Sequence, residues 1–306
     1  MEEQNKKSSI YLIPASIIFT ALIIAGAWVY TSGLKYSVKN QSASIVEKIS
    51  TAEEIASLEN LVLPMEGIVL PVEWGDLGVK MTEAGVIDAE KFETIYVERG
   101  GLSNEMKMML YGKNNGKIKM NQENAGVILN FLWALGLGNK NDILEKGPMT
   151  DSQYGGAGNF ASTGGWTLSV GDSMEHYSKH NFMNLTAEQQ AKVERVSKGI
   201  YRPCCGNATY FPDCNHGMAM LGLLELMAFQ GLSEEDMYKV ALQVNSFWFP
   251  DTYITIAQFL NSKGIEWSEV ESKEILGAEY SSGQGFSNIK SQIAPVQNKG
   301  GGGCGV

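Results

Sequence analysis

The side chains of this chain that could bind a metal or react as thiols gather in one short window. The sequence holds three histidines and four cysteines, and six of these seven residues fall between His176 and His216. Thiolate and imidazole groups together are the ligands that zinc and copper prefer in proteins. The window therefore predicts a metal-binding or thiol site.

Four residues at the end of the window are the favoured ligands. Cys204 and Cys205 are adjacent in YRPCCGN, and Cys214 and His216 are two positions apart in FPDCNHG. An apolar helix is expected to begin directly after this second motif, and the unpaired N–H groups at a helix N-terminus stabilise a thiolate. We expect these residues to bind zinc or copper.

His176 and His180 are second candidates for the same site. They stand four apart in MEHYSKH, and Asp172 or Ser173 could cap a short helix there. On a helix this spacing puts both rings on one face, with Cβ atoms ~5–6 Å apart. The positions between them lack the glutamate of an HEXXH motif, so the spacing does not predict a zinc protease.

Two other functions use the same cysteines without a metal. In a thiol–disulfide exchange protein, Cys204 or Cys205 would pair with Cys214, and the remaining thiol would exchange with Cys304. In a structural or interaction module, disulfides would only staple a helical domain. Four cysteines allow three complete pairings, and the sequence does not choose among them. Whether the chain is an enzyme is also open.

Cys304 lies near the end of a polar tail, residues 281–306, which closes with KGGGGCGV. Consecutive glycines have great backbone freedom, so the tail is predicted to be flexible and Cys304 to be a mobile thiol. The four-glycine tether alone reaches roughly 10–12 Å. Removing residues 300–306 is predicted to change metal affinity or the rate of thiol exchange without changing thermal stability.

The N-terminal segment predicts where the site is located. Residues 10–30 are apolar and uncharged, and a helix of that length spans about 31 Å, close to the ~30 Å core of a bilayer. We expect a single-pass anchor in the cell membrane, with residues 1–9 inside and the bulk of the chain extracytoplasmic. The pattern Ala25-Gly26-Ala27 supports an alternative, a cleaved signal peptide and a secreted protein. The bilayer is the only partner that the sequence predicts.

The remainder of the chain predicts helices. We expect a stalk or first helix in residues 31–60 and an all-α globular domain in residues 61–280, in which residues 61–80 could also form short strands. A capping box at Thr186 and Gln189 opens one helix, and the nearly continuous apolar run 216–230 predicts the central core helix. The Gly-rich segment 147–171 is either a packed surface loop or a lid over a site. The expected fold class is thus mostly α: a transmembrane helix, an all-α domain and a flexible tail.

Charge and missing motifs exclude several function classes. The net charge is −10, and no basic patch is visible, so nucleic-acid binding is not expected. The chain contains no Gly-rich phosphate-binding motif and no G-x-S-x-G nucleophile motif. Four cysteines in 306 residues are too few for a disulfide-dense scaffold.

Overall fold

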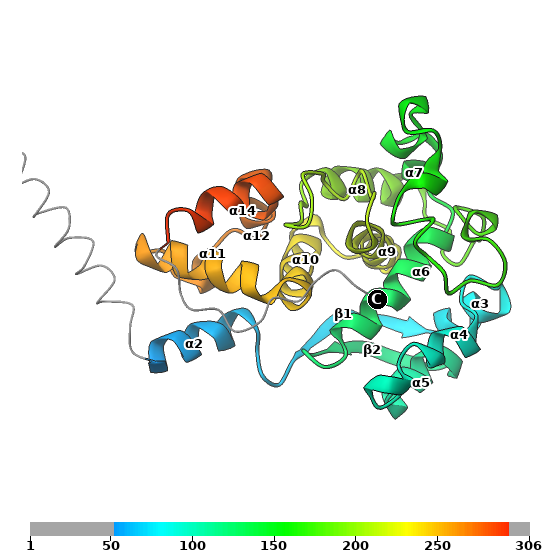
Figure 1. The fold of residues 1–306 in the computed structure, drawn as a ribbon, viewed down its shortest axis with the longest axis horizontal. Coiled ribbons are helices and arrows are strands. Elements are labelled where there is room, and N and C mark those ends of the chain that lie inside the picture. Colours follow the sequence, from blue (N-terminus) through cyan, green and yellow to red (C-terminus); the bar gives the residue numbers. More distant parts are fainter. Residues whose placement is uncertain (1–51, 294–306) are drawn as a thin grey trace, which may run out of the picture. The chain divides into compact units, whose positions relative to one another are not determined.

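The structure is a computed structural model that describes residues 52–293 (Figure 1). Its compact unit begins at Ala56. At the centre lie two helices, α6 (Ala125–Gly138) and α9 (Asn215–Phe229), which pack directly on each other. Every residue of α9 from His216 to Ala228 is buried, so the prediction of a central core helix over 216–230 is confirmed.

Two glycines allow α6 and α9 to approach closely. A Cβ atom on Gly136 would lie 2.1 Å from the carbonyl oxygen of Met218, and one on Gly222 would lie 2.4 Å from that of Leu132. Real Cβ atoms do not approach backbone atoms so closely, so the crossing requires glycine at both positions. Both helices are apolar around their circumference, because protein covers each of them on all sides.

The other helices are α2 (Ala52–Val62), α3 (Leu77–Glu83), α4 (Ala89–Thr94), α5 (Asn104–Tyr111), α7 (Asp142–Lys146), α8 (Ala187–Lys198), α10 (Glu234–Trp248), α11 (Pro250–Ser262), α12 (Ser272–Ile275), α13 (Ala278–Ser281) and α14 (Gly283–Lys290). Of these, α3, α8 and α10 pack most closely on the central pair. Short 3₁₀ turns occupy Val97–Arg99, Pro148–Thr150, Ser152–Tyr154, Ala157–Asn159, Ser173–Glu175 and Trp267–Glu269. Helix α8 opens with the predicted capping box, in which Thr186 and Gln189 satisfy each other's backbone N–H groups.

A two-stranded antiparallel sheet corrects the prediction of an all-α domain: one strand lies in residues 61–80, where short strands were considered, and the other was not predicted. Strand β1 (Ile68–Gly75) pairs with β2 (Asn115–Met120), with Ile68 opposite Met120 and Gly75 opposite Asn115. Alternate side chains of β1, Leu70, Val72 and Trp74, are buried in the core. On the other edge of β1, Gln230 exchanges two hydrogen bonds with the backbone of Glu73 and so joins the sheet to the end of α9.

The predicted membrane helix is absent from the fold that can be described. Within residues 52–293, no helix has both the length and the apolar character needed to cross a bilayer. The expected anchor, residues 10–30, lies outside the described residues. The expected fold class is wrong for the described residues, which form a mostly helical domain with one small sheet and no membrane-spanning helix.

The flexible tail was expected to begin at residue 281, but its first part contains a helix. Helix α14 begins directly after Ser282, whose side chain accepts the N–H of Gly285. Ile289 of α14 is buried, and the helix packs on α11. Local capping and an apolar face thus extend the domain beyond the predicted boundary. Cys304 lies outside the described residues.

The Gly-rich segment 147–171 packs on the body of the domain. It contains three short 3₁₀ turns, and Met149, Trp166 and Leu168 are buried. The indole N–H of Trp166 donates to the carbonyl of Val86 at 2.8 Å. These contacts match the packed-loop alternative.

Candidate metal centre

The cysteine segment is a loop between α8 and α9 that is held closed at its base. Thr209 donates its N–H to the carbonyl of Ile200 at 2.8 Å, and Tyr201 and Ala208 form an isolated antiparallel bridge. Tyr210 donates its N–H to the carbonyl of Ser197 near the end of α8. The loop therefore returns on itself and brings residues 204–205 over the start of α9.

Arg202 organises this loop from inside. Its side chain is 2% exposed and forms an ion pair with Asp213. The same guanidinium donates to the carbonyls of Asn207 and Phe211 and, through Nε, to the Sγ atom of Cys214 at 3.0 Å. One buried cation thus fixes both ends of the turn that carries the cysteines.

Cys214 caps helix α9 with its sulfur. Its Sγ atom accepts the N–H of Gly217 at 3.4 Å in addition to the N–H of Arg202. A side chain on Gly217 would lie 2.6 Å from the guanidinium of Arg202, so the close packing here requires glycine. Because helix N-termini and cations favour anions, this position stabilises a negatively charged sulfur.

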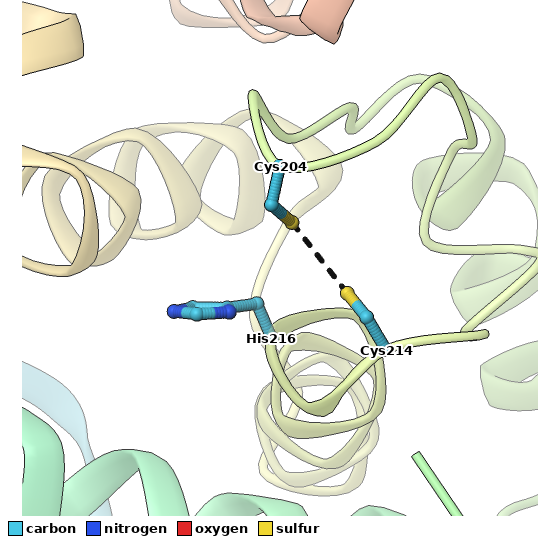
Figure 2. Close-up of side chains that lie close together, drawn as sticks. All are labelled: Cys204, Cys214 and His216. Atoms are coloured by element: carbon cyan, nitrogen blue, oxygen red, sulfur yellow. Dashed lines mark hydrogen bonds between the residues drawn. The ribbon is translucent and has the colours of Figure 1, made fainter. Parts of the chain in front are cut away.

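Cys204 contacts the same sulfur from the other side. The Sγ atoms of Cys204 and Cys214 lie 3.6 Å apart (Figure 2). Hydrogen bonds from the thiols of Cys204 and Cys205 hold the pKa of Cys214 well below its ordinary value, and Arg202 adds to this effect, while burial opposes it. Hydrogen bonds with Cys205 and Cys214 correspondingly raise the pKa of Cys204. Of these two sulfurs, Cys214 is therefore the one that favours the thiolate form.

His216 supplies the third donor of this cluster. One ligand atom of His216 and the two sulfurs of Cys204 and Cys214 all lie within 4.8 Å of one another. The imidazole is buried and packs against Phe249, with ring centroids 4.4 Å apart, and edge-on against Trp248. Its Nδ1 atom is buried and has no hydrogen-bond partner among residues 52–293. Buried polar atoms are almost always satisfied, so this nitrogen is available for a ligand.

A second group, Cys205, Asp213 and Cys214, shares one sulfur with the first. Asp213 is already engaged, because its carboxylate pairs with Arg202 and accepts the side-chain N–H of Asn207 at 2.8 Å. The thiol of Cys205 lies 3.9 Å from both the carbonyl of Asn207 and the carboxylate of Asp213. Cys204, Cys214 and His216 are consequently the better metal ligands, since no other partner occupies His216 Nδ1. All three described cysteines are free thiols.

The two histidines of the MEHYSKH motif belong to a separate place in the fold. The predicted short helix does not form there, since only Ser173–Glu175 is a 3₁₀ turn, capped by Asp172, and Ser178 has a left-handed backbone with φ of 54°. Neither histidine is grouped with a cysteine in the described residues. Instead the Nδ1 atom of His176 lies 3.1 Å from Nε2 of His180, and Nε2 of His176 lies 2.8 Å from the carbonyl of Val170.

Arg202 and Asp213 also belong to the centre, although the spacing of cysteines and histidines did not predict them. Both were within the quoted motifs YRPCCGN and FPDCNHG. The sequence signal was an arginine directly before a proline–cysteine pair, in a chain with few arginines. Its role depends on the return of the loop, which the local sequence does not reveal.

Two further segments brace the loop. The N–H of Ser162, in the Gly-rich segment, donates to the carbonyl of Asp213, and Tyr154, Phe160 and Phe211 form a cluster of three rings with centroids 5.3–5.4 Å apart. On the C-terminal side, the N–H of Gly283 donates to the carbonyl of Cys205 at 2.9 Å.

No protein-family model, no curated protein and no solved structure matches this chain. The functional assignment consequently rests on the geometry of the Cys204–Cys214–His216 cluster.

Proposed function

We propose that this protein binds a soft transition metal, zinc or copper(I), through Cys204, Cys214 and His216. The observation that carries the proposal is the buried Nδ1 atom of His216, which has no hydrogen-bond partner, in a residue whose ligand atom lies within 4.8 Å of two sulfurs. Leaving such an atom unpaired costs ~1–3 kcal/mol. A metal bond would recover that cost.

Charge favours zinc over copper(I). Two thiolates and one Zn²⁺ sum to zero, and the neighbouring Arg202–Asp213 pair is also neutral. Cu⁺ in the same place would leave one negative charge in a partly buried site, which is costly. Zinc would also replace the hydrogen bond between the Cys204 and Cys214 sulfurs with a bond from the metal to each of them.

An exchangeable site, as in a metal carrier or sensor, agrees best with the arrangement. Structural zinc sites have four protein ligands, whereas sites with three keep one position open. Cys204 is exposed, while His216 is buried against aromatic rings and Cys214 is held by Arg202 and Gly217. An exposed ligand beside an open position allows a metal to enter and leave.

Metal binding can be tested on the purified full chain by zinc titration against a chromophoric chelator, with cobalt(II) as a spectroscopic probe of thiolate ligation. We expect one tightly bound zinc and a cobalt–thiolate charge-transfer band. The variants C204S, C214S and H216N should lose tight binding. The matched variant C205S should keep it, because Cys205 faces Asn207 and Asp213 instead.

The proposal would be overturned by two results. One is the absence of tight zinc or copper(I) binding to the reduced wild-type chain. The other is a variant pattern in which H216N binds like the wild type while C205S does not.

A further inference from the structure

We infer that the metal centre is switched by oxidation: Cys204 and Cys214 form a disulfide, and its formation expels the metal. The inference rests on the proposed function, because the same two sulfurs bind the metal in one state and each other in the second. It assigns to the pair a covalent chemistry in addition to ligation.

The two sulfurs are already in contact. Their separation is 3.6 Å, and a disulfide needs ~2.0 Å, so an approach of about 1.6 Å is required. Cys214 is fixed at the start of α9 by Arg202 and Gly217. Cys204 is exposed on the turn above it (Figure 2), so Cys204 is the residue that can move to close the distance.

The adjacent cysteine is held back from this reaction. The thiol of Cys205 faces Asn207 and Asp213, and its carbonyl accepts the N–H of Gly283 at the start of α14. Cys205 lies near Cys214 as well, with its sulfur within 4.8 Å of the Cys214 sulfur, but the direct sulfur–sulfur contact of 3.6 Å is that of Cys204 with Cys214. The geometry consequently selects the 204–214 pair and leaves Cys205 reduced.

The reaction balances with a peroxide as the two-electron oxidant. The Cys214 sulfur attacks one peroxide oxygen, the O–O bond breaks, and the second oxygen leaves as hydroxide, giving a sulfenic acid on Cys214. The Cys204 sulfur then attacks the sulfenic sulfur, the S–S bond forms, and hydroxide leaves. For the loaded site, two thiolates, Zn²⁺, H₂O₂ and two protons give one disulfide, free Zn²⁺ and two waters.

Loss of the metal follows from the ligand count. The disulfide sulfurs no longer carry thiolate charge, so only His216 of the three ligands remains. The net charge of the site also stays the same, because two thiolates with Zn²⁺ sum to zero and a disulfide without a metal is uncharged. The buried Arg202–Asp213 pair thus keeps its balance in both states, and the loop can remain folded through the switch.

The test uses the full chain carrying C304S, loaded with one equivalent of zinc and treated with one equivalent of hydrogen peroxide. Zinc release is followed with a chromophoric indicator, and disulfides are mapped by mass spectrometry of peptides. We expect release in step with a 204–214 disulfide, reversal by dithiothreitol, and the same behaviour in the added variant C205S.

Each other outcome overturns the switch. Zinc that stays bound after the 204–214 disulfide has formed, or release that accompanies a 205–214 or intermolecular disulfide, refutes it while leaving metal binding intact. A reduced chain that binds no zinc refutes the proposed function as well. The two failures are therefore told apart by the untreated sample.

Discussion

The histidine pair and the cysteine cluster offer similar ligands, but they differ in what their donor atoms already bind. Both ring nitrogens of His176 have partners, the carbonyl of Val170 and the ring of His180. The Nδ1 atom of His216 has none. The comparison teaches that the spacing of ligand residues identifies candidates, whereas the hydrogen bonds around them decide which can still bind a metal.

The two regions also sit at opposite kinds of helix end. Cys214 lies at the N-terminus of α9, where unpaired N–H groups favour a thiolate. The histidine segment instead satisfies the C-terminus of α6, because Ser178 and His180 donate their backbone N–H groups to the carbonyls of Leu137 and Gly138. The first end suits an anion, and the second makes the histidine segment part of the scaffold.

Replacing one histidine from each region should give the largest difference in zinc affinity between the two regions. Zinc binding in small sites is worth about 10–16 kcal/mol, so one of the three ligands contributes roughly 3–5 kcal/mol. We expect H216N to weaken zinc binding by more than about 100-fold, and H180N to change it by less than about twofold. Competitive chelator titration measures both, and equal losses in the two variants would erase the distinction between the regions.

Helix α9 carries part of the cysteine cluster and also forms the core. A variant in its core can therefore distinguish its contribution to stability from its contribution to metal binding. Leu224 is fully buried, and we expect Leu224→Ala to lower the free energy of unfolding by ~2–5 kcal/mol. Zinc affinity of the folded variant should stay at the wild-type value, because no ligand changes. Chemical denaturation of the metal-free chain measures the first quantity. A change below about 0.5 kcal/mol would contradict the central position of α9.

The parts that the sequence predicted correctly are those fixed by local patterns. The capping box of Thr186 and Gln189 and the apolar run of α9 each need only neighbouring residues. The pairing of β1 with β2 joins segments about 45 residues apart, and its register depends on long-range contacts. The end of the domain was misjudged because α14, with its glycines, owes its stability to packing on α11.

The candidate site shows the same difference between features set by local sequence and features set by long-range contacts. Proximity of Cys204, Cys214 and His216 was predictable, because all three lie in one loop and the helix that follows it. That His176 does not join the cysteine cluster could not be predicted, because its position depends on a contact with the carbonyl of Val170 and on the left-handed turn at Ser178. The role of Arg202 as the centre of the loop likewise appears only after the chain has folded.

A pH titration tests the histidine pair as scaffold. Burial and then the neighbouring His176 lower the pKa of His180 below its ordinary value of 6.5. The unfolded chain therefore takes up this proton at a higher pH than the folded chain, and stability falls as the pH drops below about 6.5. We expect the free energy of unfolding to decline less steeply in H180N than in the wild type between pH 7 and pH 5. Parallel slopes would show that His180 contributes nothing to the acid sensitivity.

The smallest expected effect concerns Cys304, which lies outside the described residues. The cluster offers three ligands, and zinc in closed sites takes four. If Cys304 supplies the fourth, removing residues 300–306 should weaken zinc binding by about tenfold, equivalent to ~1.4 kcal/mol. The midpoint of thermal unfolding should not change, because the last few residues of a domain contribute little to folding. C304S is the matched control and should reproduce the loss, since it removes only the sulfur. Wild-type affinity in both variants would mean that the centre is complete without Cys304, and that its fourth position belongs to water.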